Sequence, residues 1–171
     1  KTVEDLKEKR GTCVNFQAAA AGCIFQVHYL RQKGIDPFVD FAEFTETPSQ
    51  DNIVLGVLNG TYDVGFIRTG QLEDMLKEEL ILSIDEFRII DRADDDFFYP
   101  HTTPLYPEWQ FSAHPNAERE LVDKMRTALL NLPADHPALV ELNANGFVLP
   151  LDNSNMNELI EALQLKSWDS Q

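Results

Sequence analysis

Apolar and polar residues along the first hundred positions alternate in two ways, as short apolar runs and as longer stretches with one apolar face. Short apolar or alternating runs predict strands within 10–16, 41–46, 62–67 and 87–91. Stretches of helical periodicity or high helix propensity predict helices over 18–33, from 48 to 60, and from the N-cap Thr69 to Leu80. This order predicts an α/β fold in which helices cover a parallel sheet.

The remainder of the chain has a different pattern, with little predicted sheet. Residues 94–108 are rich in acids and prolines and predict a connection, followed by a short strand at 109–113. Helices are predicted at 117–132, 137–144 and 155–163. We therefore divide the chain into an α/β ligand-binding lobe, 1–100, and a crossover and helix-rich segment, 101–171.

Composition narrows the classes of partner. The 171 residues are 43% hydrophobic and 25% charged, with a formal net charge of −15. So acidic a chain is unsuited to nucleic acids or anionic membranes, because binding phosphate requires a basic surface. No run approaches the roughly 20 apolar residues of a membrane helix, so we expect any membrane anchor to lie outside this sequence.

The sequence contains no recognisable metal-binding, cofactor-binding or catalytic motif. The four histidines lack metal-ligand spacing, and no serine lies in a nucleophile motif. Cys13 and Cys23 lack the paired spacing of a zinc site. We therefore predict no catalytic residue, no metal and no cofactor.

The predicted strand-to-helix junctions are the best candidates for a site, since the carboxyl edge of a parallel sheet is where ligands bind. They span 15–22, 47–51 and 68–71, and each offers helix N-terminal N–H groups suited to an anion. Arg68 directly follows an apolar strand, although pairing with a neighbouring acid explains its position equally well. The predicted ligand-binding residues are Gln17, Ala20, Ala21, Gly22, Ser49, Gln50, Asp51, Arg68 and Thr69.

Four segments in order, Lys1–Arg10, Gly34–Pro37, Val57–Gly60 and Asp63–Phe66, resemble the phosphonate-type periplasmic binding proteins of ABC transporters. Three more are closer to the branch fused to sensor histidine kinases, which the tetrathionate-respiration sensor represents. They are Arg68–Glu73, Pro104–Trp109 and Val148–Asp152. The sensor branch is therefore preferred, with a transporter substrate-binding protein as the alternative.

The resemblance implies one lobe of a type II periplasmic-binding-protein-like fold with a helical C-terminal segment that returns to a first lobe outside this sequence. It implies a small oxyanion, such as a sulfur oxyanion, clamped between lobes whose closure is the signal. It further implies a periplasmic location, an inner-membrane parent kinase and a cognate response regulator. Ala18–Ala21 and Gln50 replace the hydroxyl and histidine groups of transporter members, so phosphonate itself is not expected.

Two features acquire alternatives in this setting. Cys13 and Cys23 flank the first junction, and three states are open to them: a disulfide, thiols reactive toward a sulfur oxyanion, or simply buried small residues. The 117–132 helix has an apolar stripe that needs cover, either from residues 1–92 or from a second copy of the chain in a homodimer. Its members are Leu121, Val122, Met125, Leu129 and Leu130.

Overall fold

A computed structural model describes residues 2–107, 109–142 and 144–163. These residues fall into two compact units. The first runs to Leu105 and includes the described residues from Asn157 onward, and the second is Tyr106–Met156. Within the described residues, no helix has the length and apolar character needed to cross a membrane.

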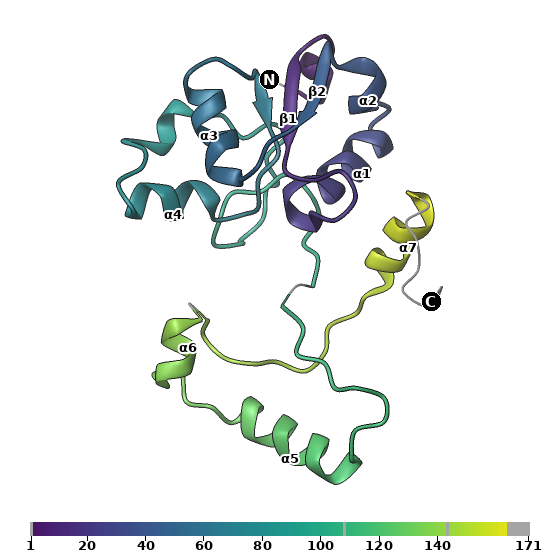
Figure 1. Ribbon diagram of the computed structural model, residues 1–171, viewed down its shortest axis with the longest axis vertical. Coiled ribbons are helices and arrows are strands. Elements are labelled where there is room, and N and C mark those ends of the chain that lie inside the picture. Colours follow the sequence, from purple (N-terminus) through teal and green to yellow (C-terminus); the bar gives the residue numbers. More distant parts are fainter. Residues whose placement is uncertain (1, 108, 143, 164–171) are drawn as a thin grey trace. The chain divides into compact units, whose positions relative to one another are not determined.

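A parallel sheet of three strands organises the first unit, in the order β2-β1-β3 (Figure 1). The central strand is β1 (Arg10–Cys13), flanked by β2 (Glu43–Glu46) and β3 (Val64–Gly65). Cys13 is opposite Glu46, and Thr12 is opposite Gly65. The predicted α/β class is confirmed, with strands shorter than the apolar runs that predicted them.

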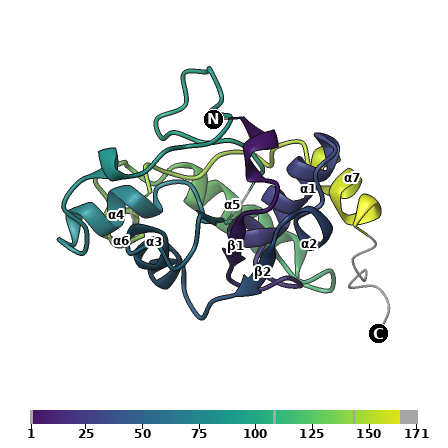
Figure 2. The same ribbon diagram turned by 90° about the horizontal axis from the view of Figure 1, so that it is seen from above.

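Helices pack on both sides of these strands. Figures 1 and 2 show α1 (Phe25–Gln32) and α2 (Pro37–Asp40) on one side, and α3 (Gln50–Leu58) and α4 (Gln71–Lys77) on the other. Shorter turns of helix are η1 (Val3–Leu6), η2 (Ala20–Ile24) and η3 (Ile84–Glu86). This arrangement brings the start of each major helix close to the end of the preceding strand.

Local chemistry explains where these helices begin. Ser49 Oγ accepts the Asn52 N–H and caps α3, as expected of a serine at this position. The predicted N-cap Thr69 is wrong, because Gly70 occupies the cap of α4 with a φ of 84°. A glycine adopts this left-handed backbone without a Cβ penalty. The predicted helix at 18–33 begins instead as the wide π turn η2 and becomes an α-helix only at Phe25.

Two predicted strands do not form. Residues 87–91 are not paired into the sheet, and Phe87 and Ile89 instead pack against the apolar cluster beneath α4. Their apolar side chains are thus used to anchor a loop, so the predicted fourth strand is wrong. Residues 109–113 also contain no strand, and Trp109 and Phe111 are exposed.

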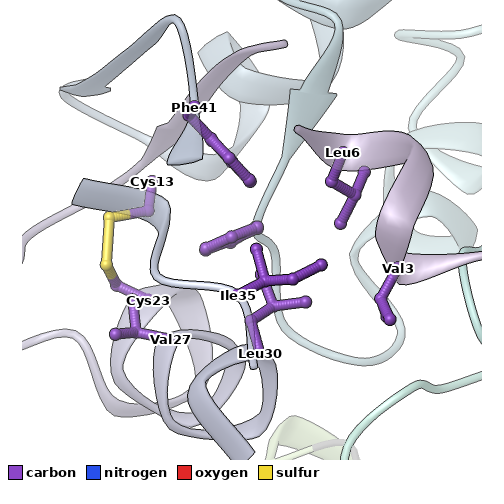
Figure 3. Packing of buried hydrophobic residues seen from close by; sticks show 9 residues of the cluster. Val3, Leu6, Cys13, Cys23, Val27, Leu30, Ile35 and Phe41 are labelled. Atoms are coloured by element: carbon purple, nitrogen blue, oxygen red, sulfur yellow. A yellow bond between two sulfur atoms is a disulfide. The ribbon is translucent and has the colours of Figure 1, made fainter. Parts of the chain in front are cut away.

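The core of the first unit has two clusters. The larger includes the disulfide between Cys13 and Cys23, which lies at one side of the cluster with Val27 of α1 beside it (Figure 3). Its buried members are Val3, Leu6, Cys13, Cys23, Val27, Leu30, Ile35, Phe41 and Phe66. The smaller cluster joins α3 to α4 and consists of Val54, Leu72, Met75 and Ile81.

The second unit has helices but little core. It contains α5 (Arg119–Leu130), α6 (Pro137–Glu141) and the start of α7 (Ser154–Ala162). No residue of α5 is buried, and Leu121 is 52% exposed. In the apolar stripe predicted from the sequence, Leu121 and Met125 are exposed and Val122, Leu129 and Leu130 are half-buried, so the stripe is only partly covered.

Candidate functional site

The three predicted junctions meet around the side chain of Gln50. Gln50 Oε1 accepts the backbone N–H of Arg68 at 2.6 Å, which joins the second junction to the third. A Cβ on Gly22 would lie 3.2 Å from Gln50 Nε2, so the first junction approaches the same amide closely. Gly22, Gln50 and Arg68 are therefore neighbours, as expected at the carboxyl edge of a parallel sheet.

A second amide, which the sequence did not reveal, links the first junction to the residue that precedes the third. Gln26 Nε2 donates to the carbonyl of Ala21 at 2.7 Å and to that of Ile67 at 3.0 Å. Gln26 belongs to α1, one turn beyond Gly22, and not to a junction. The sequence signal for it is a single amide within the apolar run 23–27.

The second junction is also held by side-chain contacts from Thr12 of β1 and Gln71 of α4. Thr12 and Thr47 are buried and share a short hydroxyl contact, while Thr12 Oγ1 donates to the Thr45 carbonyl at 3.0 Å. Gln71 Nε2 donates to Asp51 Oδ1 at 2.6 Å, which connects the first turns of α3 and α4. These contacts leave the edge of the sheet with little freedom to rearrange.

Arg68 lies at this edge with its guanidinium already engaged. Nη2 forms an ion pair with Asp74 Oδ2 at 2.5 Å, and Nη1 donates to the Thr69 carbonyl at 3.3 Å. The pairing with a neighbouring acid that the sequence left open is thus present. A Cβ on Gly70 would lie 3.5 Å from the Tyr99 ring and 3.6 Å from Arg68 Nη1, so both side chains lie close to Gly70.

Other predicted site residues are placed less centrally. Asn15 Oδ1 accepts the N–H groups of Gln17 and Ala18, and the Gln17 side chain is exposed. Ser49 uses its hydroxyl as a helix cap, and Thr69 is exposed beside Arg68. Ala20 begins the π turn that leads to Gly22. The described contacts do not bring Gln17 to Gln50.

The disulfide encloses the first junction. Cys13 ends β1 and Cys23 lies in the π turn, so the bond closes the loop that contains residues 15–22. Both cysteines are fully buried and bonded to each other, so among the open alternatives the disulfide is the one present. The Val14 N–H also donates to the Gly22 carbonyl at 3.4 Å. The backbone of this junction is therefore restrained from both ends.

The opposite end of β1 has its own charge pair. Arg10 Nη2 lies 3.0 Å from Asp63 Oδ1, and both the side chain and the backbone N–H of Arg10 donate to this carboxylate. These bonds to Arg10 lower the pKa of Asp63 to about 2. This pair joins the starts of strands β1 and β3, whereas the junctions follow the ends of these strands.

Two other kinds of site are a metal centre and an enclosed cavity. Among residues 2–107, 109–142 and 144–163, no group of three metal-binding side chains is present. A cavity of about 160 Å³ in the first unit has a mainly apolar lining and includes none of the predicted site residues. It is formed by Phe16, Ile24, Val27, Arg31, Phe38 and Leu163. Its one charged side chain, Arg31, is paired with Asp36.

An α/β unit with its polar residues at the carboxyl edge of a parallel sheet has the form of a ligand-binding domain, and comparison with known proteins identifies the class. Residues 1–155 match the family described as the phosphonate periplasmic substrate-binding protein of ABC transporters. The chain belongs to this family, which confirms the resemblance found in the sequence.

A particular relative comes from the signalling proteins. The chain is 31% identical over 134 residues to the tetrathionate sensor histidine kinase TtrS of Salmonella typhimurium (strain LT2). The match covers 78% of this chain and 22% of that protein, so the chain spans about a fifth of its relative's length. The likeness to the sensor branch that was read from the sequence is thereby confirmed.

Proposed function

We propose that this chain is the ligand-binding part of a periplasmic sensor for a small oxyanion, and that its parent protein is a histidine kinase of the inner membrane. The family match and the sensor relative support this assignment. The observation that carries it is the meeting of Gly22, Gln50 and Arg68 at one sheet edge. We expect no catalysis in this chain, and a cognate response regulator as the partner of the parent kinase.

The proposed ligand site combines one cation with backbone and amide donors. Arg68 supplies the positive charge and a planar set of N–H donors that suits an oxyanion. The backbone of residues 20–22 and the first turn of α3 supply neutral N–H groups, with Gln50, Asp51 and Thr69 at the border. Sulfur oxyanions are the class favoured, because of the sensor relative.

Signalling is proposed to follow from closure of a second lobe over this edge, the two-lobed arrangement that the resemblance implies. In that arrangement residues 101–171 form the crossover and the helices that return to the other lobe. The alternative function is substrate delivery to a transporter, which the family description favours. The gene sequence after Gln171 separates the two: a membrane helix and a phosphoacceptor histidine specify a sensor, whereas a stop codon specifies a binding protein.

The binding proposal is tested by thermal unfolding of the full two-lobed domain with sulfate, sulfite, thiosulfate, tetrathionate, phosphate and a phosphonate. An anion present at 100 times its Kd should add about 2.7 kcal/mol of stability. We expect a saturable increase in Tm with at least one sulfur oxyanion. Absence of a saturable increase with any of these anions would contradict the proposal.

Arg68→Ala tests the site, and Arg10→Ala is its matched control. Both substitutions remove an ion-paired arginine from the first unit, but Arg10 pairs with Asp63 at the other end of β1. We expect Arg68→Ala to weaken anion binding more than tenfold while Arg10→Ala leaves the Kd within a factor of about two. Equal losses in both variants would identify Arg68 as a structural residue only.

A further inference from the structure

A ligand that binds Arg68 must compete with Asp74, because Asp74 already occupies one edge of the guanidinium. We infer that Asp74 is an internal competitor for Arg68 and sets the lowest anion concentration to which the site responds. This inference rests on the proposed function and adds a residue that determines the affinity of the site.

The geometry makes direct competition possible. The ion pair uses Nη2 of Arg68, at 2.5 Å from Asp74 Oδ2, and Nη1 donates to the Thr69 carbonyl. A guanidinium presents its N–H donors as a planar fork, and a carboxylate and an oxyanion recognise the same fork. The two side chains are 40% and 35% exposed, so the pair is reachable from solvent. An anion binding Arg68 therefore displaces the carboxylate or shares the guanidinium with it.

The negative charges of the carboxylates at this edge also oppose the binding of an anion. Asp51 also lies here, and its Oδ1 is held by the neutral amide of Gln71, which leaves its negative charge uncompensated by that contact. An arriving anion thus meets two carboxylates and one guanidinium. Like charges repel, and solvent exposure moderates the repulsion. Removal of one carboxylate should therefore favour anions.

The position of Asp74 allows this effect to be isolated. Asp74 lies in α4, four residues after Gly70, whose carbonyl accepts the Asp74 N–H at 3.0 Å. An asparagine here keeps the shape and a carbonyl oxygen for Arg68 but loses the charge. Glu73 is the adjacent residue of the same helix and is likewise half-buried. Glu73→Gln therefore changes net charge and helix equally, without removing the partner of Arg68.

The test is calorimetric titration of the full two-lobed domain, as wild type, Asp74→Asn and Glu73→Gln, with thiosulfate, tetrathionate and sulfate in separate experiments. We expect Asp74→Asn to lower the Kd about three- to tenfold, and Glu73→Gln to change it less than about twofold. In an Arg68→Ala background, Asp74→Asn should lose its effect, because the competition acts through the guanidinium. If Asp74→Asn does not fold, Asp74→Ser removes the same charge and takes its place.

The outcomes separate the two proposals. Arg68-dependent binding to wild type, with an unchanged or higher Kd in Asp74→Asn, overturns the competitor role and leaves the anion site intact. Equal tightening in Asp74→Asn and Glu73→Gln also overturns it, since general charge would then be the cause. If neither wild type nor Asp74→Asn binds any of the three anions, both proposals fail.

Discussion

The larger core cluster of the first unit and the α5 helix of the second use their apolar side chains in opposite ways. Around Cys13 and Cys23, β1, α1 and the turn at Ile35 bury their apolar residues against one another. In α5 the apolar stripe is aligned on one face, yet no residue is buried. Periodicity alone therefore forms a helix, whereas burial requires an opposing surface.

The difference bears on function, because the candidate site lies in the well-packed region. Gln26, Gln50 and Gln71 hold the junctions through side-chain hydrogen bonds that depend on the packing of α1, α3 and α4. A site needs its groups held in place before the ligand arrives. The first unit supplies this rigidity, whereas α5 leaves the apolar side chains of Leu121 and Met125 exposed.

The largest expected effect is the loss of stability when a buried apolar side chain of the first unit, rather than an exposed one of α5, is truncated to alanine. Ile35→Ala should lower the free energy of unfolding by about 3 kcal/mol, since the side chain is fully buried in the larger cluster. Leu121→Ala in α5, where the side chain is 52% exposed, should cost less than about 0.5 kcal/mol. Urea unfolding followed by circular dichroism measures both. Similar losses would remove the distinction between the regions.

The disulfide comes next. Replacing both Cys13 and Cys23 by alanine should cost about 2.5 kcal/mol, because the unfolded chain regains the entropy that the closed loop had removed. Denaturant unfolding of the double variant and of oxidised wild type gives the difference. Hydrogen exchange in α5 is the internal control and should be unaltered. Equal stability of variant and oxidised protein would show that the bond does not contribute.

A smaller effect is expected at Gly65, where β3 touches α3. A Cβ there would lie 2.2 Å from Ile53 Cγ2, so Gly65→Ala forces strand and helix apart at a cost of about 2 kcal/mol. Ile53→Ala removes the obstructing atom. The loss caused by Gly65→Ala should accordingly be smaller in that background, as a double-mutant cycle measures. Strict additivity would contradict a steric cause.

The smallest effect concerns pH. The bonds from Arg10 hold the pKa of Asp63 at about 2, below the 3.8 of an unperturbed aspartate. The folded state thus favours the ionised form, so the stabilisation is complete above about pH 5 and is lost as the pH falls toward 2. The carboxylate is 38% exposed, so solvent limits the effect to less than about 1 kcal/mol.

Comparison of wild type with Asp63→Asn across this pH range measures that contribution. The difference in unfolding free energy should shrink as the solution is acidified. Asp123→Asn is the counterpart in α5, where the pair with Arg126 is more exposed, and should have a still smaller effect at neutral pH. A pH-independent difference for Asp63→Asn would contradict the ion-pair explanation.

Much of this architecture is determined by the sequence through short-range patterns. Apolar runs and helical periodicity predicted the strands near 10–13, 43–46 and 64–65 and the helices that follow them. Because parallel strands end at one edge, the same patterns predicted that the three junctions would be close together. Gly22, Gln50 and Arg68 lie together as that reasoning requires. Their role in binding a ligand stays a prediction.

Tertiary structure alone decided which side chains connect the junctions to one another. Gln26, Gln71 and Asp74 lie inside helices, where periodicity gives no indication of their partners across the junctions. Residues 87–91 have the composition of a strand but pack as a loop against the α4 cluster. A local pattern specifies which face of a segment is apolar. The surface that meets this face depends on contacts between residues distant in sequence, and only the folded chain supplies those contacts.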